Sequence, residues 1–377
     1  MRIGIDYTPA LGQQAGIGRY TRELVSALLK QPGRHEYVLI KAKGSSSHSP
    51  IDSSATSVTL PFSRRMSALI WHRLRLPITL ETFTGALDLY HATDYLIPPL
   101  RKAKGVVTVH DLSFLVHPEL GAAGLVKYLR SALPVSLDRA SLVLADSQNT
   151  KKDIADLLGF AKERVEVVYC GVSEYFRPAD DATELERVRE KYGLHSPYIL
   201  TLGTIEPRKN YVRLIQAYQQ LRAENGIAHD LIIGGGKGWL YQDVFDEVKS
   251  LGLEKQVRFL GFVPDDDLLG MLSLAELFVY PSIYEGFGLP PLEAMACGTP
   301  VVASNTSCLP EILGDAAVFV DPLDVSSMAN GMISMLSNDG LKNDMKARGI
   351  KRASRFTWAD SAGCLLNLYD RLEEVGL

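Results

Sequence analysis

The chain alternates short apolar runs rich in β-branched residues with longer amphipathic stretches, and this alternation restricts its fold more than any other feature. The runs of the first half are MRIGIDY, YVLI, LDLYHA, GVVTVHD and LVLADS, and those of the second half are YILTLG, DLIIGG, VRFLG, LFVYPS, PVVAS and AVFVD. Helical periodicity follows several of them, as in residues 19–30, 211–223 and 240–251. Strands that alternate with helices predict βαβ units and parallel sheets, so we expect an α/β fold.

With 377 residues, the chain is longer than one hydrophobic core usually organises, so we expect two doubly wound, Rossmann-like domains. The boundary is expected near VSEYFRPADDATELERVREKYGLHSP, where an aromatic-Arg-Pro segment gives way to a charged helix, giving domains at 1–176 and 177–357. Residues 358–377 have helical periodicity but no following strand. Some other surface must therefore cover the apolar face of this last helix.

Two cations, Arg208 and Lys209, follow the predicted strand YILTLG in the segment LGTIEPRKN. The carboxyl end of a strand is where open α/β sheets bind their ligands. An arginine fork and a lysine point charge at that place can hold a diphosphate. The alternative is an ordinary solvated pair of charges in a loop.

The stretch YEGFGLPPLEAMACGTPVVAS follows another predicted strand, and its loop contains Glu285, Gly286, Phe287 and Gly288. Pro290 and Pro291 suit the first turn of a helix, because proline lacks the N–H that this turn cannot use. Glycines allow a ligand to approach the backbone, and the free N–H groups of a helix start attract anions. The stretch therefore predicts a phosphate site.

Two glutamates lie in the same stretch, although a carboxylate repels a phosphate. Glu293 could complement the helix dipole or close a capping box in the first turn. It could instead accept hydrogen bonds from the two hydroxyls of a ribose. Glu285 could bind hydroxyls of a sugar next to the phosphate. The residues alone leave these alternatives open.

Three further segments have both a structural and a functional interpretation. His110 ends the predicted strand GVVTVHD, where it could be structural or could donate to a substrate hydroxyl or phosphate. The loop Gly12–Gly18 has glycines at 12, 16 and 18, which is not a dinucleotide-binding GxGxxG, but it could contact a ligand through its backbone. The acids Asp265 to Asp267 suit the start of a helix better than a metal site.

Charge is unevenly distributed between the two halves. Residues 1–176 contain 21 Lys and Arg against 16 Asp and Glu, a balance of +5, whereas residues 177–377 contain 19 against 28, a balance of −9. The acidic second half argues against nucleic-acid binding. The basic first half includes FSRRMSALIWHRLRL at 62–76, which could lie on an anionic membrane or pack into its own domain.

The sequence also indicates where the protein works. It has no apolar run of about 20 residues that could span a bilayer, no secretory leader pattern and no CxxC or disulfide framework. We therefore expect a cytoplasmic protein, with a peripheral location on the inner face of the membrane as a further possibility.

Taken together, these motifs resemble the retaining glycosyltransferases of the GT-B fold in glycosyltransferase family 4, also called group 1. The resemblance covers nearly the whole chain. It rests on GIGRY, VHDLSF, ADSQNTKKDI, YCGVSEYFRP, LGTIEPRKN, VRFLGFVPDDDL and YEGFGLPPLEAMACGTPVVAS, in which Glu285 and Glu293 occupy the places of the two glutamates of that family. It implies two Rossmann-like domains facing a cleft, with the C-terminal helix crossing back to the first domain.

The resemblance also implies a role for each candidate residue. Arg208 and Lys209 would neutralise the donor diphosphate, and Glu293 would hold its ribose. Backbone near Phe262 and Val263 would meet the base. Donor sugar and phosphates would contact Glu285 and the turn Gly286, Phe287, Gly288 and Leu289. His110 would reach the transferred sugar, and Gly16 to Gly18 would lie near phosphate or acceptor. The residues implied to act in the reaction itself are His110, Glu285, Arg208 and Lys209.

The family transfers sugars with retention of configuration and without a divalent metal, so the resemblance implies no cofactor besides the donor substrate. VHDLSFLVHPE together with GIGRYTREL looks most like the mannosyltransferase branch that builds bacterial surface polysaccharides. We expect a donor of the GDP-mannose or UDP-glucose type and a glycan or lipid-linked acceptor. The alternatives are a sugar-nucleotide epimerase of the same architecture and a non-catalytic sugar-nucleotide-binding protein.

Overall fold

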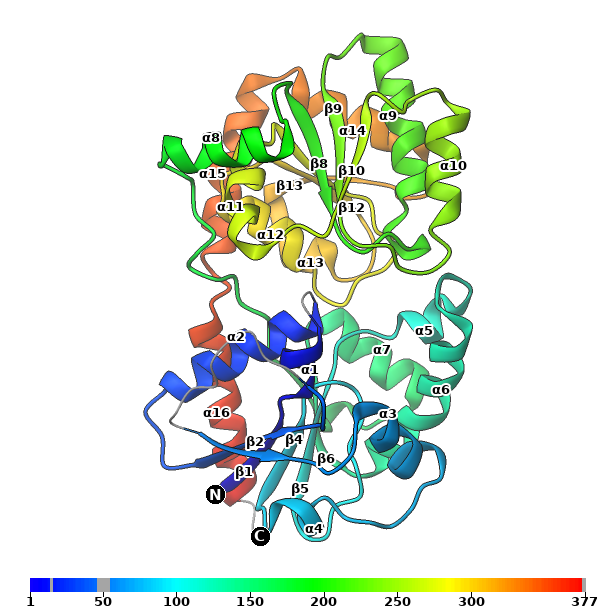
Figure 1. Cartoon of the computed structure of the whole chain (residues 1–377). Helices are drawn as coiled ribbons and strands as arrows, with labels where there is room; N and C mark the ends of the chain where they lie inside the picture. Colours follow the sequence, from blue (N-terminus) through cyan, green and yellow to red (C-terminus); the bar gives the residue numbers. More distant parts are fainter. Residues whose placement is uncertain (14–15, 46–54, 375–377) are drawn as a thin grey trace. The chain divides into compact units, whose positions relative to one another are not determined.

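The computed structural model describes residues 1–13, 16–45 and 55–374 (Figure 1). The chain divides into two compact units. Unit 1 comprises Met1–Pro118, Ala123–Gly171 and Thr357–Leu377, and unit 2 comprises Glu119–Ala122 and Val172–Phe356. The sequence placed the division at 176/177 and 357/358. It falls earlier because the Val172 N–H donates to the Phe356 carbonyl oxygen at 2.8 Å, which ties both segments into unit 2.

Unit 1 is built on a parallel sheet that has seven strands within the described residues, in the order β3-β2-β1-β4-β5-β6-β7. Buried apolar side chains fill its central strands, as a parallel sheet covered on both faces requires. The strands are β1 Arg2–Asp6, β2 Glu36–Lys41, β3 Thr56–Thr59, β4 Leu89–Ala92, β5 Lys104–Val109, β6 Ala140–Ala145 and β7 Val165–Val167.

The helices of unit 1 are α1 Thr8–Gly12, α2 Ile17–Lys30, α3 Arg64–Ser67, α4 Glu81–Thr84, α5 Ser113–Val116, α6 Ala123–Asp138, α7 Gln148–Leu158 and α16 Trp358–Glu374. The last of these covers the first unit, as predicted. Its Trp358 ring meets the edge of Tyr20 on α2 at 6.0 Å between ring centroids, and its Tyr369 hydroxyl lies 2.7 Å from Nδ1 of His91. The apolar face of the C-terminal helix is therefore buried within unit 1.

Unit 2 contains a second parallel sheet, with six strands in the order β10-β9-β8-β11-β12-β13. Its strands are β8 Tyr198–Leu202, β9 Asp230–Gly234, β10 Val257–Gly261, β11 Leu277–Tyr280, β12 Val301–Ser304 and β13 Ala317–Val320. Its helices are α8 Ala182–Tyr192, α9 Tyr211–Asn225, α10 Gln242–Ser250, α11 Asp265–Leu274, α12 Leu289–Ala296, α13 Leu309–Leu313, α14 Val325–Leu336 and α15 Asp339–Ala353. The predicted pair of doubly wound sheets is confirmed.

The sequence did not predict the two strands that end the sheet of unit 1, β3 and β7. The β3 sequence TSVT is polar and mostly exposed, and β7 has only three residues. An edge strand is covered less than a central one, so it does not need the apolar run by which the other strands were recognised. Among the described residues, no helix combines the length and the apolar character needed to cross a bilayer.

The loops after β8 and β9 approach each other so closely that one position requires glycine. A Cβ on Gly235 would lie 1.9 Å from the Gly203 carbonyl oxygen, and Gly235 has a φ of +153°. The Gly203 N–H donates to the Gly234 carbonyl oxygen at 2.9 Å. This contact extends the pairing of the two strands beyond their ends and fixes the path of both loops.

We expect Gly235→Ala to destabilise the protein by about 2–4 kcal/mol, because the methyl group forces the two backbones apart and strains φ. The urea midpoint of unfolding measures this loss. Gly236→Ala is the matched control, since a Cβ there meets nothing within 4 Å. Equal midpoints for the two variants would show that the close approach is not essential.

Candidate functional site

The candidate site lies at the point where the strand order of unit 2 reverses. From β8 the chain proceeds to β9 and β10 on one side, and β11, β12 and β13 follow on the other side of β8. Where the connections that follow two adjacent parallel strands lead to opposite sides, a crevice forms at the carboxyl ends of these strands. Open α/β sheets bind their ligands in such a crevice. The loop after β8 contains Arg208 and Lys209, and the loop after β11 contains Glu285. The structure thus brings these three predicted residues together.

Glu285 lies between the two cations. Its Oε2 is 2.7 Å from Arg208 Nη1, and its Oε1 is 2.6 Å from Lys209 Nζ. All three side chains are largely buried. Burial alone would raise the pKa of Glu285, but the two cations lower it to about 2. The sequence predicted sugar contacts for Glu285 and phosphate contacts for the two cations, whereas in this structure the three residues are ion-paired with each other.

A second carboxylate, which was not predicted from the sequence, balances the second cation. Glu206 is buried, and its Oε1 accepts from Arg208 Nε at 3.0 Å and lies 2.8 Å from Nη2. Lys209 Nζ also donates to the Tyr280 hydroxyl at 2.8 Å. Two cations therefore face two carboxylates. The pattern EPRKN after a strand contained this signal, because Glu206 stands two residues before Arg208.

Backbone hydrogen bonds hold the loops after β8 and β11 in one arrangement. The Arg208 side chain donates to the Tyr284 carbonyl oxygen, and the Ile283 N–H donates to the Arg208 carbonyl oxygen at 2.9 Å. Asn210, which has a left-handed conformation with φ of 61°, donates its side-chain N–H groups to the carbonyl oxygens of Pro281 and Pro322. The two cations are thus positioned before any ligand arrives.

The glycine turn after Glu285 leads directly into α12. Gly288 precedes the helix with φ of +96°, and a Cβ there would lie 2.8 Å from Cδ2 of Leu309. Leu289, Pro290 and Pro291 form the first turn, as predicted for a helix start. The loop from β11 therefore ends in a helix N-terminus, which favours anions.

Glu293 is the fifth residue of α12 and is buried. It thus lies beyond the first turn, so the capping-box interpretation left open by the sequence is wrong. Phe287 directs its ring against Phe356, with ring centroids 5.7 Å apart. Phe287 thus packs its side chain into the core. The turn residues whose backbone no side chain shields are Gly286 and Gly288.

The carboxyl end of β10 provides a different kind of surface. Phe262 directly follows this strand and is 46% exposed, whereas the neighbouring Val263 is buried. Between β10 and β8 lies the glycine-rich end of β9, in which Gly234, Gly235 and Gly236 come in sequence. From its apolar run, β9 was expected only as a strand. Its run IIGGGKG was a signal for a close backbone approach that could have been recognised.

In unit 1, both ring nitrogens of His110 have buried partners. Nδ1 lies 2.7 Å from Asp146 Oδ2, and Nε2 lies 2.9 Å from the Thr93 carbonyl oxygen. A carboxylate and a carbonyl can only accept, so both nitrogens donate and the ring is an imidazolium. Burial alone would lower the pKa of His110, but the charge and hydrogen bond of Asp146 raise it to about 9. A hydrogen bond from Nε2 to a sugar would have to replace the one to Thr93.

The predicted glycine loop before α2 has one glycine that packing explains. A Cβ on Gly18 would lie 1.9 Å from the Gln13 carbonyl oxygen, so no larger residue fits there. Gly16 precedes α2 with φ of 55°, and a Cβ on it would meet nothing within 4 Å. Residues 14 and 15 of this loop lie outside the described residues.

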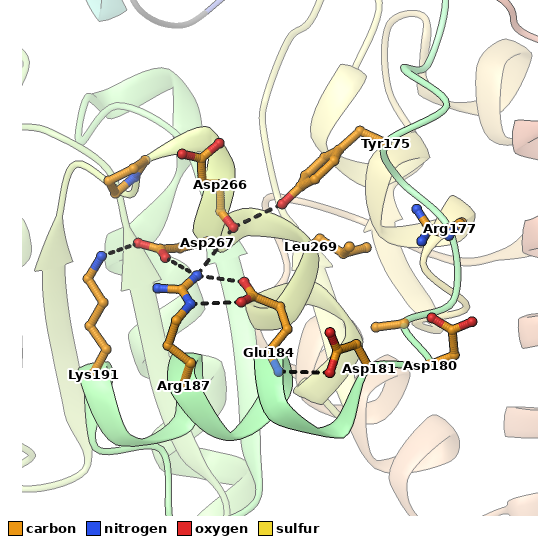
Figure 2. A pocket seen from close by; sticks show the side chains of 12 residues that line it. Tyr175, Arg177, Asp180, Asp181, Glu184, Arg187, Lys191, Asp266, Asp267 and Leu269 are labelled. Carbon is orange, nitrogen blue, oxygen red and sulfur yellow. Dashed lines mark hydrogen bonds and ion pairs between the residues drawn. The ribbon is translucent and has the colours of Figure 1, made fainter.

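The acids Asp265 to Asp267 form the first turn of α11, as the sequence predicted. Asp267 also accepts hydrogen bonds from three side chains of α8. Burial alone would raise its pKa, but hydrogen bonds from Lys191, Tyr192 and Arg187 lower it to about 2. Figure 2 shows Arg187 and Lys191 of α8 reaching this carboxylate. Asp267 therefore fastens α11 to α8.

These side chains line a surface pocket of about 570 Å³ in unit 2 (Figure 2). It is formed by residues of the segment 175–181, of α8, and of the start of α11 with the residue before it. The lining residues are Tyr175, Arg177, Ala179, Asp180, Asp181, Glu184, Arg187, Lys191, Pro264, Asp266, Asp267 and Leu269. None of the predicted site residues is among them. The pocket is thus distinct from the ion-paired cluster at the sheet reversal.

Across the described residues, the geometry offers one group of potential metal ligands, His35, Asp370 and Glu373 in unit 1. The carboxylates of this group already pair with Arg34 and with the Met1 amino group, and His35 Nε2 lies 3.0 Å from Asp370 Oδ1. None of the residues of the candidate site belongs to it. An ion-pair network explains the group without a metal.

The family model described as "Glycosyl transferases group 1" matches residues 183–352, and that described as "Glycosyltransferase Family 4" matches residues 15–174. The O-antigen chain mannosyltransferase B of Escherichia coli is 36% identical over 385 residues, covering 99% of this chain and 100% of that protein.

Two solved structures show that the fold is shared over the whole chain. The sucrose-phosphate synthase of Thermosynechococcus elongatus superimposes with a TM-score of 0.79 at 20% identity, covering 100% of both chains. Alr3699/HepE of Anabaena, solved in complex with UDP and glucose, gives a TM-score of 0.74 at 20% identity, covering 98% of both chains. The GT-B fold expected from the sequence is thereby confirmed.

We expect His110→Gln to destabilise the protein more at about pH 5.5 than at about pH 10, by about 1–3 kcal/mol. The folded pKa of His110 is above the ordinary 6.5, so its stabilisation is complete below that value and is lost as the pH rises through about 9. The measurement is the urea midpoint of variant and wild type at both pH values. A difference between them that does not change with pH would contradict the imidazolium.

Proposed function

Because the chain belongs to the group 1 and family 4 glycosyltransferases, we propose that it transfers a hexose from a nucleoside diphosphate sugar to a glycan. Mannose is the favoured sugar and glucose the next candidate, since the E. coli relative is a mannosyltransferase. The acceptor is a glycan or lipid-linked glycan of a surface polysaccharide, as the name of that relative, an O-antigen chain enzyme, suggests.

The observation that carries the donor assignment is the cluster of Arg208, Lys209 and Glu285 at the reversal of strand order, beside the start of α12. An ammonium group can donate three hydrogen bonds. Within the described residues, that of Lys209 donates one to the Tyr280 hydroxyl and one to the Glu285 carboxylate. The third can be donated to a phosphate oxygen. Fixed cations next to a helix N-terminus then stabilise the negative charge that grows on the departing nucleoside diphosphate.

The other donor contacts are assigned along the same edge of the sheet. Glu293, buried in the second turn of α12, accepts hydrogen bonds from the ribose hydroxyls. Backbone of Phe262 and Val263 contacts the base, and the exposed Phe262 ring offers an aromatic face beside it. Glu285 and the turn 286–289 contact the sugar and the phosphates. In unit 1, we assign His110 to the transferred sugar and Gly16 to Gly18 to phosphate or acceptor.

We further propose that transfer retains the configuration of the sugar and requires no divalent metal. Arg208, Lys209 and the N-terminus of α12 supply the positive charge that a metal would otherwise supply. Activity in the presence of EDTA should equal that of the untreated enzyme. Loss of activity in EDTA and its recovery with Mg²⁺ or Mn²⁺ would contradict metal independence.

The donor is identified by thermal shift with GDP, UDP and ADP, followed by turnover of the matching nucleotide sugars. A nucleotide that binds only the folded protein raises its melting temperature through linkage. We expect GDP to give the largest shift. Formation of an epimerised nucleotide sugar without acceptor would contradict the transferase assignment in favour of an epimerase.

Arg208→Ala and Glu293→Gln should each lower transfer about a hundredfold or more, because each removes a contact to a charged or hydroxyl group of the donor. Matched controls are Arg348→Ala and Asp315→Asn, which remove exposed charges of unit 2. Initial rates at saturating acceptor, with melting temperatures for each variant, are the measurement. A well-folded Arg208 or Glu293 variant with wild-type rates would refute the assignment of that residue.

A further inference from the structure

A surface of unit 1 combines exposed leucines with arginines. It is formed by residues 64–78 and by the exposed face of α6, and we call it the Arg-Leu surface. Large apolar side chains that are more than a third exposed gather in its first segment: Met66, Leu69, Leu74, Leu76 and Ile78. Leu74 is the most open of them, at 58%. Scattered exposed apolar residues are normal, but five within 15 residues form a patch that indicates a binding surface.

The segment is anchored by its opposite face. Trp71 is buried, its ring meets the edge of Phe62 at 5.1 Å between centroids, and its indole N–H donates to the Ile78 carbonyl oxygen at 2.7 Å. Ile70 packs against the same core. The sequence left open whether 62–76 packs into its own domain or lies on a membrane. The structure shows that Phe62, Ile70 and Trp71 pack into their own domain. The other large apolar side chains of the segment are exposed to solvent.

Cations surround the exposed leucines. Arg64, Arg65, Arg73 and Arg75 are exposed on the segment, and α6 adds Lys127 and Arg130. The segment adjoins α6 directly, because the Arg73 guanidinium lies 5.7 Å from the centre of the Tyr128 ring and Arg75 Nη2 is 3.5 Å from the Ser131 carbonyl oxygen. Figure 1 shows α3 and α6 on the same side of the sheet.

Acidic side chains are scarce on this surface, and the one acid within its two components is the exposed Asp138 that ends α6. Residues 61–80 and 123–137 contain no Asp or Glu. Outside the two components, Asp94 pairs with the surface, since its Oδ2 lies 2.5 Å from Arg64 Nη2. The exposed Arg348 of unit 2, by contrast, has two acidic neighbours, Asp344 and Asp315. Six cations against Asp94 and Asp138 give this surface a net positive charge.

We propose that the Arg-Leu surface docks on the surface of an anionic phospholipid membrane. Arginines attract the negative head groups, and leucines beside them enter the boundary between head groups and acyl chains. A nucleic acid would use the cations but has no place for this row of leucines. The docking does not depend on the donor assignment, because the surface includes none of the residues of the candidate site.

The test is co-sedimentation of the full chain with vesicles of phosphatidylcholine, with and without phosphatidylglycerol. Binding is expected only with the anionic lipid and should fall as salt is added. The double variant Arg73→Gln/Arg75→Gln should lower the partition coefficient about 30-fold, since each cation near an anionic surface contributes about 1 kcal/mol. Leu74→Ser/Leu76→Ser should lower it about tenfold or more.

Two matched variants remove similar groups from unit 2. Arg189→Gln/Arg348→Gln removes two exposed arginines, and Leu240→Ser/Leu323→Ser removes two leucines that are each 62% exposed. Both should bind vesicles like the wild type, and all variants should keep its melting temperature. Absence of vesicle binding, equal binding to neutral vesicles, or wild-type binding by either Arg-Leu surface variant would overturn the proposal.

Discussion

The carboxylate of Glu285 lies between Arg208 and Lys209, and the arrangement of unit 2 around its candidate site depends on this contact. The three residues come from the loops after β8 and β11, which are neighbours in the sheet but lie far apart in the sequence. A buried charge is costly unless it is paired, and losing one partner of such a pair costs about 3–5 kcal/mol. The ion pairs therefore hold both loops at the reversal of strand order and keep two buried cations beside the start of α12.

This arrangement also has a consequence for ligand binding. With Glu206 included, the cluster pairs two cations with two carboxylates. It therefore keeps two cations buried while the net charge of the cluster is zero. A diphosphate that enters would compete with the carboxylates for hydrogen bonds that already point the right way. Hydrogen-bond donors that are fixed in advance need little reorganisation when charge develops on a leaving group, which is the source of most electrostatic catalysis.

The fold and the position of the site could be predicted from local patterns. Central strands of a parallel sheet are continuous apolar runs, so β1, β4, β8 and β11 were recognisable, and residues just after them were expected at one edge. Edge strands such as β3 lack that pattern. The ion pairs of the site residues could not be predicted, because three-dimensional geometry decides that Glu206 meets Arg208 and that Asp146 meets His110. The sequence did show each of these acids next to a strand end, but not which cation it would meet.

We propose that Arg208, Lys209 and the turn before α12 hold the diphosphate of the donor. A crystal structure of the protein with a bound nucleoside diphosphate tests it most directly. We expect phosphate oxygens within about 3 Å of the Arg208 guanidinium and the Lys209 ammonium, with the ribose hydroxyls at Glu293. Phosphates bound in the pocket at Arg177, with the ion pairs of Glu285 unchanged and Glu293 away from the ribose, would contradict it.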